Sequence, residues 1–414
     1  MQAHDEVLIR NYPNGITLLG ERMPGVASAA LSILVPVGVS TDPVGQVGAA
    51  SVLAEMFHKG AGDFDSRALA AEFENIGAQR SHSSGTEVSY FSAAVLGQNL
   101  AHTLRLMSTV LLQPRLPDDE LDNVRQLALQ ELKSLEDEPS QKVMVELTSR
   151  LYPEPWGRCQ LGTEAGLQAI TPQNLRSYFK ERYVADRVII GVAGRFDWQQ
   201  IQDVVGECFG TWGGSNPPVP YGSLPNKSSV HHLQRETSQL QIALAYPSVS
   251  VADPDHNIAR VANGVLSGGM SGRLFIEVRE KRGLVYRVSS SYSAAVGRSA
   301  VFVYAGTTPE NGETCLRVII NELNKLGDDV TDEELRRSKA DLKSKIVMSL
   351  ESSSGRASSL VSEYFNLKRV RTLEEVKHAI DSVTRDDFKH HFASHPVSPI
   401  TLVTLGSKSL ELPA

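Results

Sequence analysis

An internal repeat restricts the fold of this chain more than any other feature. The segment LPDDELDNVRQLALQELKSLEDEPS has a counterpart in VTDEELRRSKADLKSKIVMSLESSS, in which Leu121 corresponds to Leu335, an offset of 214. A second pair of similar segments, TPQNLRSYFKERYVADRVIIGVAG and TRDDFKHHFASHPVSPITLVTLG, aligns Thr171 with Thr384, an offset of 213. Two separate anchors with nearly the same shift indicate a duplicated domain of about two hundred residues.

A cluster of prolines marks the boundary between the two copies. Residues 213–229 contain Pro217, Pro218, Pro220 and Pro225. Proline fixes φ and removes a backbone donor, so neither a helix nor a sheet continues through such a segment. We therefore predict a first domain over residues 1–212, a Pro/Gly-rich linker over 213–229 and a second domain over 230–414.

Each copy mixes strand and helix patterns. The runs NGITLLGERM and AALSILVPVG are apolar and bounded by turn residues, as in strands, whereas GQNLAHTLRLMSTVLLQ repeats apolar residues at helical spacing. Strands often follow one another without an intervening helix, which favours antiparallel pairing. The pattern predicts an α+β fold of two homologous domains, each an antiparallel sheet with helices packed on one face.

Composition excludes several classes of function. The net charge is −7, and no positive charge is clustered as nucleic-acid binding would require. No apolar run approaches the ~20 residues that span a bilayer, and the start of the sequence lacks the apolar stretch of a signal peptide. Cys159, Cys208 and Cys315 are odd in number and far apart, so we expect them to be reduced. We expect a cytoplasmic protein, or a periplasmic one if a signal was removed before residue 1.

The most specific string is SGGMSGRLFIEVREKRGLVYRVSSSY, residues 267–292. It closely resembles the second-half motif of the pitrilysin/insulinase family of zinc metallopeptidases, which includes the mitochondrial processing peptidases. The duplication, the linker and the half-length resemble the same family. The resemblance implies six-stranded antiparallel sheets covered by helices, and a two-domain chain that forms half of a clamshell around an extended peptide.

The active members of this family carry His-x-x-Glu-His on a helix. Two histidines four residues apart bind one Zn²⁺, the glutamate takes a proton from the metal-bound water, and a distant glutamate completes the ligands. In GAASVLAEMFHKGAG the flanks are kept, but Ser51 and Glu55 stand at the histidine positions and Ala54 at the glutamate position. We call these three positions the degenerate motif. Glu131, 131 − 55 = 76 residues on, stands where the resemblance places the distant ligand.

A serine hydroxyl is a poor zinc ligand and alanine is no base, so we expect no metal on this chain. Glu55, His58 and Glu131 remain vestigial candidates, because Glu55 and His58 share a helix face and Glu131 could approach them. The simpler interpretation places His58 at a helix end, where positive charge is favoured, and Glu131 on a solvated face. Ser81 and His82 replace the Asn-Ala pair that is usual in the family, which favours an ordinary hairpin there.

The second half contains two residues that match a substrate-binding pair of the family. Arg279 and Tyr286 are seven residues apart and match an arginine and a tyrosine that, in the family, bind the substrate main chain and the developing oxyanion. The alternative is that Arg279 belongs to the mixed charge run EVREKR on a solvated helix and Tyr286 to a strand core. The preceding SGGMSG lacks a Walker lysine, so we expect a turn or loop and not a phosphate site.

The resemblance therefore implies a non-catalytic, substrate-binding subunit of a heterodimeric zinc endopeptidase. Its partner would be a homologous subunit that carries His-x-x-Glu-His and the Zn²⁺, while Arg279 and Tyr286 would act in trans on unfolded or short peptides. Two alternatives stay open. One is an active zinc peptidase with a rearranged metal site at Glu55, His58 and Glu131, and the other is a purely structural scaffold subunit.

Overall fold

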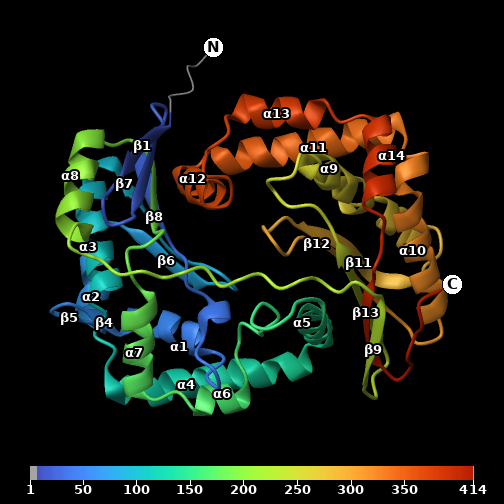
Figure 1. The fold of residues 1–414 in the computed structure, drawn as a ribbon, viewed down its shortest axis with the longest axis horizontal. Helices are drawn as coiled ribbons and strands as arrows, with labels where there is room; N and C mark the ends of the chain where they lie inside the picture. The colour runs from blue at the N-terminus through green and yellow to red at the C-terminus, as the bar shows by residue number, and fades with distance from the viewer. Residues whose placement is uncertain (1–6, 414) are drawn as a thin grey trace. The chain divides into compact units, whose positions relative to one another are not determined.

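The computed structural model describes residues 7–413, which form two compact units (Figure 1). Unit 1 comprises the described residues of Met1–Ser134, Arg158–Pro220 and Met348–Val370, and unit 2 those of Leu135–Gly157, Tyr221–Val347 and Arg371–Ala414. Residues 213–228, in the predicted linker, contain no helix or strand. No described helix is both long and apolar enough to cross a bilayer. The first six residues, on which the expectation about a leader partly rests, lie outside the described part.

Unit 1 is built on a six-stranded sheet with the strand order β1-β2-β8-β3-β7-β6. All neighbouring strands are antiparallel except β2 and β8, which run parallel. A short hairpin of β4 and β5 is separate from this sheet. The strand bounds are β1 Leu8–Asn11, β2 Thr17–Arg22, β3 Ser28–Val35, β4 Gly60–Ala61, β5 Phe64–Asp65, β6 Gln79–Ser84, β7 Ser89–Leu96 and β8 Ile189–Gly194.

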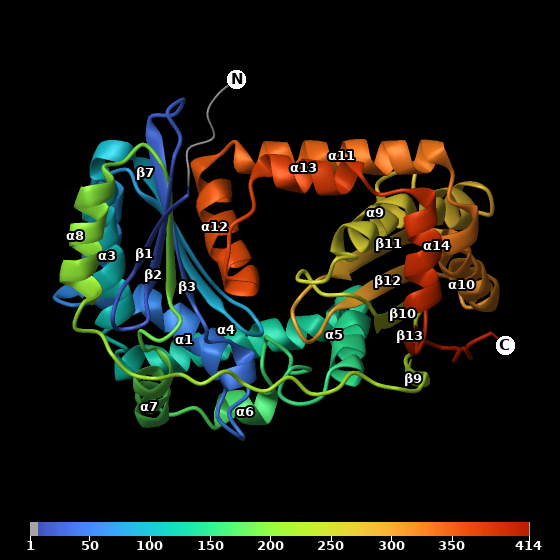
Figure 2. The same ribbon diagram turned by 45° about the horizontal axis from the view of Figure 1, so that its top comes forward.

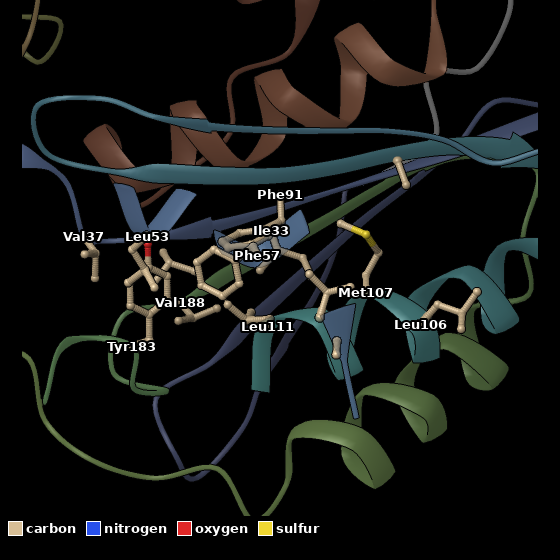
Figure 3. Packing of buried hydrophobic residues seen from close by; sticks show 14 of the residues in the cluster. Ile33, Val37, Leu53, Phe57, Phe91, Leu106, Met107, Leu111, Tyr183 and Val188 are labelled. Carbon is tan, nitrogen blue, oxygen red and sulfur yellow. The ribbon is translucent and has the colours of Figure 1, made fainter. Parts of the chain in front are cut away.

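Helices from the first half of the sequence cover one face of this sheet. Their apolar residues and those of β3 and β8 form one core, in which Phe57, Phe91 and Met107 meet (Figure 3). Burying side chains of this size supplies the main favourable term for folding. The helices are α1 Ala49–Met56, α2 Ser66–Asn75, α3 Leu100–Leu112, α4 Asp118–Ser134, α6 Glu164–Gln168, α7 Pro172–Arg182 and α8 Trp198–Phe209, with short turns η1 Val39–Thr41, η2 Phe57–Lys59 and η3 Gly97–Asn99.

A helix from the second half covers the opposite face of the same sheet. This helix, α12 (Ser353–Leu367), lies beside β3 and β8 (Figure 2) and buries Leu360 and Val361 against apolar residues of the strands. The backbones approach so closely that a Cβ on Gly191 would lie 2.8 Å from the carbonyl oxygen of Ala357. Arg356 of α12 also forms an ion pair with Glu21 of β2, and both side chains are largely buried.

Unit 2 contains a five-stranded sheet with the order β11-β12-β10-β13-β9, in which only β13 and β9 are parallel. Helices α9, α10 and α14 contribute to the core on one face, and α5, from the first half of the sequence, contacts β10 and β13. The strands are β9 Ser229–Gln234, β10 Leu240–Pro247, β11 Val285–Ser293, β12 Ala300–Thr307 and β13 Thr401–Gly406. The helices are α5 Pro139–Leu151, α9 His256–Ser267, α10 Gly312–Asp329, α11 Asp332–Leu350, α13 Leu373–Asp381 and α14 Arg385–Ser394, with η4 Leu135–Asp137 and the π-helix η5 Phe275–Glu280.

The predicted α+β fold with helices on mainly antiparallel sheets is confirmed. Two details differ from the expectation. The sheet of unit 2 has five strands among the described residues, and each sheet also contacts a helix contributed by the other half of the sequence. The compact units therefore differ from the ranges 1–212 and 230–414. The physical reason is that β3, β8, β10 and β13 are buried at nearly every position, so both faces of each sheet need a cover.

Candidate functional site

The helix that carries the degenerate motif has a firmly held start. Asp42 is buried, and its two carboxylate oxygens accept hydrogen bonds from the backbone N–H groups of Gly48 (2.7 Å) and Ala50 (2.8 Å). Burial raises the pKa of Asp42 to about 6, although these hydrogen bonds and Arg158 oppose the shift. This capping satisfies amide donors that have no partner within the helix. The start of α1, and with it the three motif positions, is thus held in place by buried hydrogen bonds.

None of the three motif positions offers an imidazole. The Ser51 hydroxyl donates a hydrogen bond to the backbone carbonyl of Gln160, so it already has an acceptor. The Ala54 carbonyl oxygen lies 3.2 Å from Nδ1 of His82. Glu55 is exposed. A hydroxyl, a methyl group and one solvated carboxylate do not fit the ligand sets of catalytic zinc, which need three side-chain ligands.

The structure does not assemble the rearranged metal site. Within residues 7–413, the ligand atoms of Glu55, His58 and Glu131 do not gather within 4.8 Å of one another. Glu131 is exposed on α4, as the simpler interpretation expected. His58 lies half-buried in η2, and burial, together with the positive charge of Arg80, lowers its pKa.

His82 is placed differently from a residue of an ordinary surface hairpin. Its ring stacks on Phe91, with centroids 4.0 Å apart, and meets Phe57 edge-on. Burial lowers the pKa of His82 to about 4, so the ring is neutral at pH 7. The buried Nε2 has no hydrogen-bond partner among the described residues. Sequence reasoning missed this role because β6 reads as polar throughout. Ser81 beside it is exposed, on the edge strand of the sheet.

Arg279 differs from its charged neighbours in η5. Lys281 and Arg282 both form ion pairs with Glu277, at 2.6 and 2.7 Å, and their hydrogen bonds lower the pKa of Glu277. The Arg279 side chain is exposed, and its guanidinium carbon lies 5.2 Å from the centroid of the Phe275 ring. No ion pair joins Arg279 to any residue in the range 7–413. Its donors are therefore available to another molecule.

Tyr286 lies at a β-bulge. Val285 pairs with Thr307 and Arg287 with the next residue, Gly306, so Tyr286 is the extra residue of β11. Its side chain is 65% exposed, which contradicts the alternative that placed it in a strand core. Bulges re-aim side chains and are frequent next to functional sites. The Tyr286 hydroxyl has no hydrogen-bond partner in the described part of the chain.

A buried arginine anchors the segment that leads to Arg279. SGGMSG forms a loop after α9, as expected, and Arg273 follows it directly. Arg273 bonds to Glu334 through Nε at 2.6 Å and also pairs with Asp329. Burial opposes ionisation of Glu334, but the hydrogen bonds from Arg273 and Thr331 lower its pKa to about 2. The only sequence signal for this anchor was an arginine after the glycine loop and the acidic start of α11.

Comparison with known proteins identifies the family of both halves of the chain. The family model described as Insulinase (Peptidase family M16) matches residues 18–164, and that described as Peptidase M16 inactive domain matches residues 169–342. An uncharacterized zinc protease of Bacillus subtilis, YmxG, is 28% identical over 91% of this chain and 93% of its own length. One from Mycobacterium tuberculosis strain H37Rv is 27% identical over 96% and 93%.

Two solved structures share the fold. A peptidase M16 inactive domain from Pseudomonas fluorescens superposes with a TM-score of 0.90, at 23% identity and 99% coverage of both chains. A protease from Helicobacter pylori gives a TM-score of 0.89 at 18% identity, over 97% of this chain and 99% of its own. From its two matching family models, its full-length relatives and its fold, the chain belongs to the M16 family, the pitrilysin/insulinase family of metallopeptidases.

Proposed function

We propose that this chain is the non-catalytic, substrate-binding subunit of a heterodimeric zinc endopeptidase. The observation that carries the proposal is a contrast between the units. In unit 1 the degenerate motif offers one exposed carboxylate, and in unit 2 an arginine and a tyrosine present unpaired donors to solvent. A purely structural subunit has no use for such donors. The partner would be a homologous subunit with an intact His-x-x-Glu-His motif, and the substrate an unfolded or short peptide.

In this proposal the partner's Zn²⁺ supplies the activated water, and this chain supplies hydrogen bonds. The Arg279 guanidinium and the Tyr286 hydroxyl donate to the substrate main chain and to the carbonyl oxygen that gains negative charge. Phe275 limits the motion of the guanidinium by contact with its face. The ion pairs of Arg273 hold the start of this segment in place. Because Ala54 cannot accept a proton, no general base for hydrolysis is assigned to the degenerate motif.

The expected size of the effect follows from one hydrogen bond to a charged group. Such a bond contributes about 1.5–3 kcal/mol net. Losing about 2 kcal/mol from the transition state slows turnover roughly thirtyfold, at about 1.4 kcal/mol per decade. We therefore expect Arg279→Ala or Tyr286→Phe to lower kcat of the complex by one to two decades. KM should change less, because the interaction is strongest in the transition state.

The test is reconstitution with a zinc-bearing homologous subunit of the same organism. Each variant is mixed with the wild-type partner, the complex is sized, and peptide hydrolysis is measured. Lys281→Ala is the matched control, because Lys281 lies two residues from Arg279 and pairs with Glu277. Full activity from a properly assembled Arg279→Ala, Tyr286→Phe double variant would refute the trans role and favour a scaffold subunit.

We also propose that the chain acts in the cytoplasm. No disulfide joins cysteines within residues 7–413, and Cys315 is buried. Reduced thiols fit a reducing compartment, whereas secreted proteins tend to form disulfides. Fractionation of cells that express the chain from its own start codon would test this, and recovery in the periplasmic fraction would contradict it.

A further inference from the structure

Three potential metal ligands from distant parts of the sequence meet in unit 2. Asp255 is the residue before α9, while His391 and His395 lie four residues apart at the end of α14. Oδ2 of Asp255 lies 2.8 Å from Nδ1 of His391 and 3.9 Å from Nδ1 of His395. Within residues 7–413 this is the only group of three His, Cys, Asp or Glu residues whose ligand atoms lie within 4.8 Å of one another.

The distances suit a small divalent ion. Ligand atoms that bind zinc at about 2.0–2.1 Å in tetrahedral geometry lie about 3.4 Å apart. The separations of Asp255 from His391 and from His395, 2.8 and 3.9 Å, lie on either side of this value, and the third is within 4.8 Å. Small side-chain rotations would therefore bring all three atoms to binding distance. His391 lies in the last turn of α14 and His395 caps it. The His395 N–H donates to the His391 carbonyl and the two ring centroids are 4.9 Å apart, so both imidazoles lie at one end of the helix.

The chemistry of the donors selects the class of metal. Two imidazoles and one carboxylate are the three protein ligands of many zinc sites, which keep a fourth position for water. Calcium and magnesium prefer several oxygen ligands, whereas two of the three residues in this cluster are imidazoles. The ring of His391 is buried, and its Nδ1 already lies 2.8 Å from the Asp255 carboxylate. A small cavity borders both histidines.

We propose that Asp255, His391 and His395 form a binding site for a divalent transition metal of the zinc class. The ion would join the start of α9 to the end of α14, two helices that already contact each other. A simple hydrogen bond between Asp255 and His391 accounts for two of the residues. This hydrogen bond does not explain why the His395 side chain, which is 41% exposed, also lies near the same carboxylate.

This site is separate from the degenerate motif. The sequence-based expectation that the chain binds no metal rested on Ser51, Ala54 and Glu55, which are in unit 1. Asp255 and His391 are 136 residues apart, so no local spacing indicated the cluster. The site would hold the fold of unit 2 together and takes no part in the proposed hydrolysis.

The experiment measures zinc uptake by the full, untagged chain at buffered free Zn²⁺. We expect about one tightly bound zinc per chain, and a higher melting temperature in its presence. His395→Ala and Asp255→Asn should each weaken zinc binding at least about tenfold, the effect that even supporting residues of metal sites produce. His395 is half-exposed and Asp255→Asn is isosteric, so both variants should fold, which circular dichroism checks.

Two controls make the result specific. His390→Ala removes an exposed histidine from the same helix, outside the cluster, and should bind zinc as the wild type does. Glu55→Gln, in the degenerate motif, should also leave uptake unchanged. The proposal is wrong if the wild type takes up no saturable zinc, or if His395→Ala binds it as tightly as the wild type. Loss of uptake in Glu55→Gln alone would transfer the metal to unit 1 and likewise overturn it.

Discussion

Removing the carboxylate of Glu21 tests how α12 is held on the sheet of unit 1. Arg356 donates to the same Glu21 oxygen from Nε, at 2.8 Å, and from Nη2. The two side chains are only 9% and 14% exposed. Glu21→Gln keeps the shape and a hydrogen-bond acceptor but leaves the guanidinium buried without a counter-charge. Breaking a buried ion pair in this way costs about 3–5 kcal/mol, and we expect about 3 because neither group is fully enclosed.

Hydrogen exchange measures this effect locally. If α12 opens more easily by about 3 kcal/mol, the amides of residues 353–367 should lose about two decades of protection, at about 1.4 kcal/mol per decade. The control is Glu207→Gln, which breaks the ion pair between Arg105 and Glu207 on the surface of the same unit, where both side chains are about half exposed. Exposed pairs contribute little, so its protection should match the wild type.

A double variant separates charge from packing. Glu21→Met combined with Arg356→Met replaces the pair by apolar side chains, and such replacements are often neutral or stabilising. We therefore expect protection of α12 close to that of the wild type. Equal protection in Glu21→Gln and Glu207→Gln would refute the reasoning, because it would mean that the Arg356 charge is solvated when its partner is lost.

Two further predictions concern the first unit. His82→Phe keeps an aromatic ring against Phe91 but removes a group whose pKa falls from 6.5 to about 4 on folding. A pKa that is lower in the folded state makes the stability of the protein fall as the pH drops from about 6.5 to about 4. The urea midpoints at pH 7 and pH 4.5 should therefore differ less in the variant than in the wild type. If the two midpoints differ as much in the variant, other groups cause the loss of stability. The second prediction uses a His395→Ala background, in which Ser51→His, Ala54→Glu and Glu55→His restore the zinc motif. This variant should take up zinc in a way that depends on Glu131. A folded variant without zinc uptake would show that α1 is misaligned with the motif.

The repeat and the apolar periodicity predicted the two α+β units, but they could not assign every helix to its sheet. An amphipathic pattern shows which face of a helix is apolar and not which surface it will cover. The available signal was in the strands. SAALSILV in β3 and IIGVAG in β8 are apolar almost throughout, which is typical of strands buried on both faces. Gly191 in β8 is a second signal, because a glycine within a strand leaves room for another backbone to approach one face of the sheet.

For the candidate site too, some features could be predicted from the sequence and others could not. The resemblance to a known family predicted the degenerate motif and the pair Arg279 and Tyr286, because each lies within one short segment. The bulge at Tyr286 could not be predicted, since it depends on how β11 pairs with β12. The stacking of His82 on Phe91 and the contact of Asp255 with His391 depend on tertiary packing, which a single sequence does not encode in any local pattern.

The cover that α12 gives to unit 1 has a consequence for biosynthesis. The last strand of that sheet ends at Gly194, whereas α12 ends at Leu367, an interval of 367 − 194 = 173 residues. At about 5–20 residues per second, a ribosome needs roughly 9–35 s to make this interval. During that time one apolar face of a finished sheet has no partner, which favours aggregation or capture by a chaperone. We expect the nascent first half to remain bound to such factors until the ribosome has passed Leu367.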